Sequence, residues 1–181
     1  MTKDYLNTLA LFIKNQLLLS FNSNNENLLF PTNNVNDYSC KGLFFSVINT
    51  DETESAREGE LFEKADLKNA VQNIVSKLSA KLKLIDYSYN KLQISNFRLT
   101  YVYDVIYLKN PLEWDENKDG VYFQWGQKYR GLFLPNQIKK IQGSKIDVLD
   151  RLLCHEIGLI SNLWRMPEGL VFKIDCEQVT I

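Results

Sequence analysis

The chain has 181 residues, 45% of them hydrophobic, and a formal net charge of −1. A chain of this length can bury a sizeable core without disulfides or metals, so we expect one domain spanning residues 1–181. The near-neutral charge provides no basic field that would gather phosphates, and this disfavours nucleic-acid binding.

The cysteines, Cys40, Cys154 and Cys176, are far apart, and an odd number cannot pair fully within one chain. We therefore expect reduced thiols and a cytoplasmic location. The longest apolar run near the amino terminus, residues 9–13, breaks at Lys14. This run is too short for a signal peptide or a membrane span, and we expect no membrane association.

The first half of the chain combines helical stripes with short apolar runs. Hydrophobic residues at helical spacing predict two helices, and an aromatic-rich run predicts a buried strand between them. The polar run after the strand favours a solvated loop. In chain order we predict a helix near 3–19, an Asn-rich loop with an apolar anchor over 21–37, a strand near 41–48, a loop over 49–60 and a helix near 66–85.

The second half is dominated by strands. A period of two places alternate residues of the first strand on one face, and a polar turn joins the next two strands as a hairpin. Ser144 with Asp147 supplies a helix cap, and Gly158 can end that helix in the left-handed conformation. We predict strands near 95–108, 120–125, 129–134 and 170–177, and a helix near 145–157.

The strands thus come as hairpins or long alternating runs rather than in regular alternation with helices. This order predicts an α+β fold with an antiparallel sheet and packed helices.

One turn is similar to the opening of a calcium-binding loop. Asp115, Asn117, Asp119 and Gly120 have the spacing of the first oxygen ligands and the glycine of such a loop. However, Gly126 stands where the closing bidentate Glu is needed. We therefore expect a polar turn leading into a strand, and no bound metal.

Cys154 and His155 suggest a nucleophile and its base, because thiolate chemistry needs a nearby imidazole. Neighbours on a helix project about 100° apart and do not face each other. We expect His155 to be a solvated or edge residue, with contact to a residue from another element as the alternative, and we assign no catalytic residue. The sequence also contains no phosphate loop and no dinucleotide fingerprint, so we expect no cofactor.

Several segments together resemble the AMMECR domain family, which is named for a human chromosomal region. Their order and spacing match this family, and Asp86 and Tyr89 fall where its members tend to have an Asp and a Phe. The segments are Gly120-Val121, Gly131 to Pro135, Leu149, Leu152 to Cys154 with His155 following, Gly158-Leu159 and Trp164. The family's Arg-Gly-Cys-Ile-Gly motif falls on Lys41, Gly42, Leu43 and the two residues after them, and only the glycine is kept.

The resemblance implies an α+β domain with a cleft between a larger and a smaller part, and it implies no known reaction. Many microbial members look associated with Memo-type and radical-SAM proteins, which suggests a shared modification pathway and possible partners of these two kinds. We therefore expect a binding or accessory component of such a pathway. The alternative is a small transferase or modification enzyme that uses the cleft.

Lys41 and Gly42 are the candidate ligand-binding residues. A glycine within a strand suggests a bulge, or the close approach of another backbone or a ligand. The lysine beside it can offer a point charge to a carboxylate or phosphate, although not the planar contact of an arginine. The alternative is a glycine at the start of a strand beside a solvated lysine.

Overall fold

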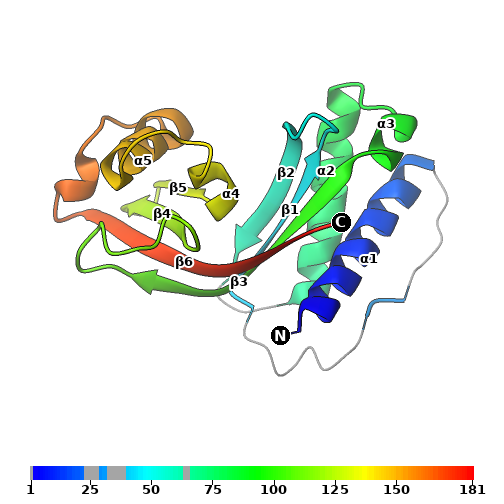
Figure 1. Ribbon diagram of the computed structural model, residues 1–181, viewed down its shortest axis with the longest axis horizontal. Coiled ribbons are helices and arrows are strands. Elements are labelled where there is room, and N and C mark those ends of the chain that lie inside the picture. Colours follow the sequence, from blue (N-terminus) through cyan, green and yellow to red (C-terminus); the bar gives the residue numbers. More distant parts are fainter. Residues whose placement is uncertain (1, 23–28, 32–39, 63–65) are drawn as a thin grey trace. The chain divides into compact units, whose positions relative to one another are not determined.

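The structure is a computed structural model that describes residues 2–22, 29–31, 40–62 and 66–181. Figure 1 shows helices and strands in both halves of the chain. The helices are α1 (Lys3–Asn22), α2 (Leu67–Leu84), α3 (Tyr89–Gln93), α4 (Pro135–Ile138), α5 (Lys145–Arg151), the π-helix η2 (Leu152–Ile157) and the 3-10 helix η3 (Leu163–Arg165). The strands are β1 (Gly42–Ile48), β2 (Glu54–Leu61), β3 (Asn96–Tyr107), β4 (Gly120–Trp125), β5 (Tyr129–Phe133) and β6 (Gly169–Thr180).

The strands form a six-stranded sheet in the order β2-β1-β3-β6-β4-β5. β1 pairs antiparallel with β2 and β3, and β4 pairs antiparallel with β5 and β6. β3 and β6 also run in opposite directions. Backbone hydrogen bonds join Phe97 to Ile181 and Leu108 to Val171, so the start of β3 lies beside the end of β6. The predicted α+β class and the antiparallel sheet are confirmed.

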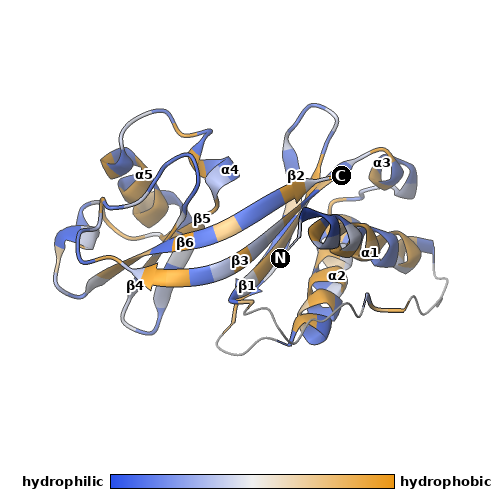
Figure 2. Ribbon diagram, turned by 60° about the horizontal axis from the view of Figure 1, so that its bottom comes forward, coloured by the Kyte–Doolittle hydropathy of each residue, from blue (hydrophilic) through white to orange (hydrophobic). Residues whose placement is uncertain are grey.

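The chain divides into two compact units, Met1–Val102 with Glu177–Ile181, and Tyr103–Cys176. In the first unit, α1 and α2 lie on one face of the sheet, where Lys14 sits 4.9 Å over the ring of Phe97. Figure 2 shows hydrophobic and hydrophilic residues alternating along both helices. The core under them includes Leu6, Leu9, Ile13, Leu17, Leu43, Phe45, Leu78, Leu82, Phe97 and Leu99, all fully buried.

The second unit has a hydrophobic core of its own between the β4–β5 hairpin and the helices that follow it. Asp150 supports this core from its edge, because one carboxylate oxygen accepts hydrogen bonds from the indole of Trp164 and the backbone of Asn162. The core residues include Val121, Phe123, Phe133, Leu149, Leu152, Leu153 and Trp164. Most residues that carry the family resemblance are therefore packing residues of this unit.

The helix predicted over 145–157 forms, but its second half differs. The carboxylate of Asp147 accepts hydrogen bonds from the backbone and the hydroxyl of Ser144, as the predicted cap requires. The chain then widens into the π-helix η2 and ends at Gly158, which has a φ of 76°. The predicted left-handed end is confirmed.

The loop predicted over 49–60 is wrong in its larger part. Its residues 54–60 belong to β2, which pairs with β1 at every residue except Ser55. A polar edge strand carries little hydrophobic alternation, so its sequence is similar to that of a loop. Of the Asn-rich segment 21–37, residues 23–28 and 32–37 lie outside the described residues, and the ring of Phe30 contacts Phe12 edge-on at 5.3 Å.

No helix among the described residues is both long and apolar enough to span a bilayer. The cleft that the resemblance implies stays a prediction.

Candidate functional site

Lys41, Gly42 and Leu43, which the resemblance singled out, are fixed mainly by their backbone. Lys41 is half-buried, its N–H donates to the carbonyl of Val102, and its carbonyl accepts from the N–H of Phe62. Leu43 is fully buried on the helix side of β1. No described contact involves the ammonium group of Lys41, so its role toward an anion stays a prediction.

The backbone of β2 accounts for the glycine at position 42. A Cβ atom built on Gly42 would lie 3.0 Å from the carbonyl oxygen of Glu60 and 2.8 Å from a methyl of Leu61. This is the close approach of another backbone that the sequence suggested. The glycine is thus needed for strand pairing, whether or not a ligand lies nearby.

The other residues that the resemblance singled out lie elsewhere. Asp86 is exposed, has a φ of 52°, and follows the last turn of α2, where a left-handed residue commonly ends a helix. Cys154 and His155 are both exposed on η2, in the second unit. Within the described ranges, no three His, Cys, Asp or Glu side chains lie close enough to hold a metal ion.

The thiols differ in their surroundings, which leads to a prediction about their reactivity. Burial raises the pKa of the Cys40 thiol, and burial together with the nearby Asp175 carboxylate raises the pKa of Cys176 to about 12. Cys154 is exposed. Because only the thiolate is alkylated, we expect iodoacetamide at pH 8 to modify Cys154 at least about tenfold faster than the other two.

Peptide mass spectrometry of the alkylated protein measures this difference. In urea the three cysteines should react at similar rates, which serves as the control. Equal rates in the native protein would show that Cys40 and Cys176 are not protected.

The calcium-like turn lines an open hollow of about 760 Å³ in the second unit. Its carboxylates are already used by the backbone, because Asp115 accepts from the N–H of Asn117 and Asp119 accepts from the N–H of Asp115. The ammonium group of Lys145 donates to the carbonyls of Leu112 and Trp114. These bonds hold a polar turn, as the sequence predicted.

A more promising arrangement lies in the first unit, on the sheet face opposite α1 and α2. Arg57 on β2 pairs with Ser46 on β1, which pairs in turn with Arg98 on β3. Paired residues point to the same face of a sheet, so Ser46 lies between two arginines whose Cα atoms are roughly 9.5 Å apart. We call the residues of this region the polar sheet face: Ser46, Glu54, Arg57, Arg98, Thr100 and Gln178.

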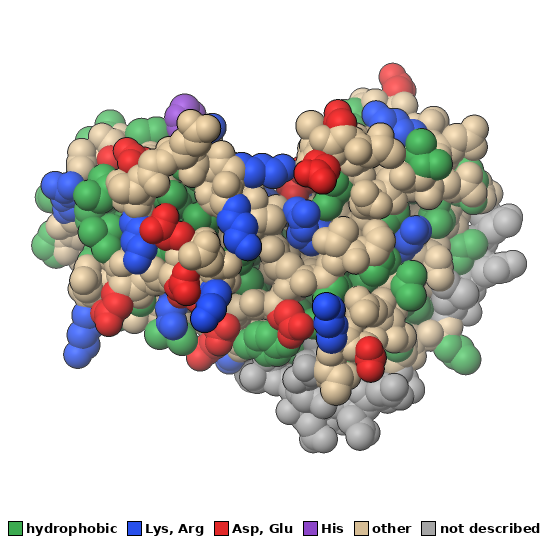
Figure 3. Space-filling model, viewed as in Figure 1, with side chains coloured by type: hydrophobic (Ala, Val, Ile, Leu, Met, Phe, Trp, Pro, Cys, Tyr) green, Lys and Arg blue, Asp and Glu red, His purple; other side chains and the backbone are tan. Residues whose placement is uncertain are grey.

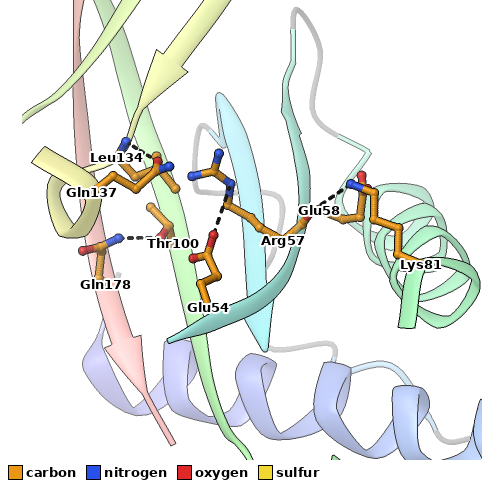
Figure 4. Close-up of polar contacts among 8 residues, drawn as sticks. All are labelled: Glu54, Arg57, Glu58, Lys81, Thr100, Leu134, Gln137 and Gln178. Carbon is orange, nitrogen blue, oxygen red and sulfur yellow. Dashed lines mark hydrogen bonds and ion pairs between the residues drawn. The ribbon is translucent and has the colours of Figure 1, made fainter. Parts of the chain in front are cut away.

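The two faces of β2 have different partners. Glu58 points toward α2, where it forms an ion pair with Lys81. Arg57 and Glu54 point away from α2, as Figure 4 shows. On the same face, the side-chain amide of Gln178 donates to the hydroxyl of Thr100 at 2.8 Å.

A β-bulge brings Glu54 onto the polar sheet face. Residues three apart in a regular strand point to opposite faces, but the register shifts between Val47 and Ile48, and Ser55 lies between two paired residues without a partner of its own. Glu54 therefore shares a face with Arg57, and Oε1 of Glu54 lies 4.0 Å from Nε of Arg57.

Side chains outside the strand hold the bulge in place. The hydroxyl of Ser55 donates to Oδ1 of Asn49 at 2.7 Å, and the same oxygen accepts from the hydroxyl of Tyr87 at 2.8 Å. Tyr87 is buried, and Asn49 and Ser55 are partly buried. The position of Glu54 is thus set by the turn that begins at Asn49.

The Glu54–Arg57 pair leaves one atom of each side chain without a partner. Nη1 of Arg57 and Oε2 of Glu54 are buried and make no hydrogen bond to the described residues. Among those residues the guanidinium of Arg98 has no ion pair or hydrogen bond either. A buried charged group without a partner costs roughly 1–3 kcal/mol or more, so the face has donors and an acceptor ready for a ligand.

Charges elsewhere are mixed in sign. Figure 3 shows basic and acidic side chains interspersed over one face of the molecule. With this mixture of signs and a formal net charge of −1, we expect no extended basic field around the arginine pair.

Sequence reasoning missed the polar sheet face. Arg57 and Glu54 fall in the segment predicted as a solvated loop, and Arg98 lies in a strand predicted from its period of two alone. The available signal was the pairing of two short segments around the polar turn after Ile48, which is the pattern of a hairpin.

The comparisons with known proteins support the fold and give no information about the site. No family model matches the chain, and no curated protein matches it. A solved structure, the uncharacterised protein PH0010 from Pyrococcus horikoshii, is similar to it with a TM-score of 0.79 and 14% sequence identity. The match covers 99% of this chain and 93% of that one, so the two proteins share a fold over almost their whole length.

Proposed function

We propose that the protein is a binding or accessory component of a modification pathway, and that its polar sheet face holds a small anionic ligand. The observation that carries this proposal is the buried, unpartnered Nη1 of Arg57, with the uncommitted guanidinium of Arg98 across the intervening strand. Arginine binds carboxylate and phosphate groups through a planar fork of donors. Two such forks on one face favour a ligand with two anionic groups.

The wider context of this proposal comes from the family resemblance. We propose that the chain is a divergent member of the AMMECR domain family, that it is cytoplasmic, and that its partners are Memo-type or radical-SAM proteins. Recovery of such a partner on the tagged protein supports an accessory role. Reproducible turnover of metabolites, lost in a variant of the polar sheet face, would instead identify an enzyme.

Succinate, a small dianion, is the first probe for the anion site. We expect saturable binding in calorimetric titrations at low salt, and about tenfold weaker binding for Arg57→Gln and for Arg98→Gln. The effect should decrease as salt is added, because exposed charge interactions are screened.

Arg151→Gln is the matched control, since Arg151 is exposed at the end of α5 in the second unit and should leave the affinity unchanged. The same titration of Lys41→Ala tests whether that lysine contributes to the binding of succinate. Equal affinity of the wild type and both arginine variants would reject the anion site.

A further inference from the structure

The acidic residue on the polar sheet face restricts what the arginines can bind. The face carries two guanidinium groups and the carboxylate of Glu54, whose Oε2 is buried and accepts no hydrogen bond from the described residues. A ligand with only anionic groups would satisfy Arg57 and Arg98 but would place a negative charge beside this oxygen. Like charges repel each other at short range, so Glu54 selects against such a ligand.

A ligand that fits every group must carry a cationic donor next to one of its anionic groups. Nε of Arg57 and Oε1 of Glu54 are only 4.0 Å apart, so their partners must be neighbouring groups of one small molecule. An ammonium and a carboxylate on the same carbon atom meet this requirement. Arg98, across β1, is placed for a second carboxylate.

The two side chains are accessible enough to form these contacts. The side chains of Arg57 and Glu54 keep 20% and 25% of their surface exposed. The terminal torsion of a glutamate is soft, so a small rotation of the carboxylate turns Oε2 toward a ligand. The ion pair that this rotation loosens is long and partly exposed, and such pairs contribute little to stability.

From these contacts we infer that the polar sheet face selects a free acidic amino acid. Its ammonium donates to Glu54, its α-carboxylate accepts from Arg57, and its side-chain carboxylate lies toward Arg98. The single negative charge of such a ligand balances the single positive charge that the three residues carry together. This inference rests on the proposed anion site and adds the class of ligand.

Three probes and two variants test the inference by calorimetry: L-aspartate, succinate and the α-amide of L-aspartate. We expect the wild type to bind L-aspartate about tenfold more tightly than succinate, because only L-aspartate offers Glu54 a donor. Glu54→Gln should weaken the binding of L-aspartate about tenfold and strengthen the binding of succinate. Glu60→Gln is the matched control, since Glu60 is exposed and lies two positions after Glu58, which faces α2, so it points away from the polar sheet face.

Each outcome decides a separate point. Succinate binding to the wild type as tightly as L-aspartate would overturn the inference while leaving the anion site intact, as would Glu54→Gln changing both affinities equally. If the α-amide binds as tightly as L-aspartate, the α-carboxylate is not recognised. The ligand of the face would then be a peptide amino-terminus rather than a free amino acid. If none of the three probes binds, the anion site itself fails. Equal melting temperatures of Glu54→Gln and the wild type confirm that the variant is folded.

Discussion

Replacing Gly59 with alanine should lower the free energy of unfolding by about 3 kcal/mol or more. A Cβ atom at this position would lie 2.2 Å from the carbonyl oxygen of Leu43 and 2.5 Å from Cα of Phe44. Both are backbone atoms of β1, so no side-chain rotation relieves the clash. Gly59 also has a φ of 154°, which side chains rarely allow.

Gly126→Ala is the matched control, because Gly126 also has a positive φ, 58°, but a Cβ atom there meets nothing within 4 Å. This variant should cost only about 1 kcal/mol, the price of the left-handed backbone alone. Urea unfolding followed by circular dichroism measures both variants. Equal destabilisation would show that β2 does not press against β1 as described.

Truncating Leu78 to alanine should cost about 2–5 kcal/mol. Leu78 is fully buried in α2, so the change removes buried methyl groups and leaves a cavity among well-packed neighbours. The loss of stability is larger than the transfer free energy of the removed groups alone, because the surroundings close only part of the cavity.

Leu84→Ala makes the same chemical change in the same helix, where the side chain is 83% exposed. We expect its unfolding free energy to stay within about 0.5 kcal/mol of the wild type. Denaturant midpoints of the two variants give the comparison. A destabilised Leu84→Ala, or a Leu78→Ala with wild-type stability, would contradict the assignment of the buried face of α2.

The long helices could be predicted because one physical pattern determines both their formation and their burial. Leu6, Leu9, Ile13 and Leu17 recur at helical spacing, and each is fully buried. The β4–β5 hairpin could be predicted for a similar reason, since its turn lies between two short strands. In both cases residues close in the sequence carry the information.

β2 and the candidate site could not be found in this way. β2 contains Glu54, Glu58 and Glu60, and it becomes a strand through its pairing with β1 rather than through local preference. The neighbours Ser46 and Arg98 lie on strands far apart in the sequence, so only the register brings them together. Charged residues at unrelated positions give no periodic signal.

The bulge at Ser55 means that segment length, rather than chemistry alone, specifies the Glu54–Arg57 pair. Removing the single codon for Ser55 would make the strand regular and leave Glu54 two positions before Arg57, so both side chains would still point to the same face. In inheritance, the pair therefore tolerates the in-frame loss of this codon, whereas one further codon inserted between Glu54 and Arg57, with the bulge kept, would turn Glu54 toward α2 although both charged residues remain in the gene.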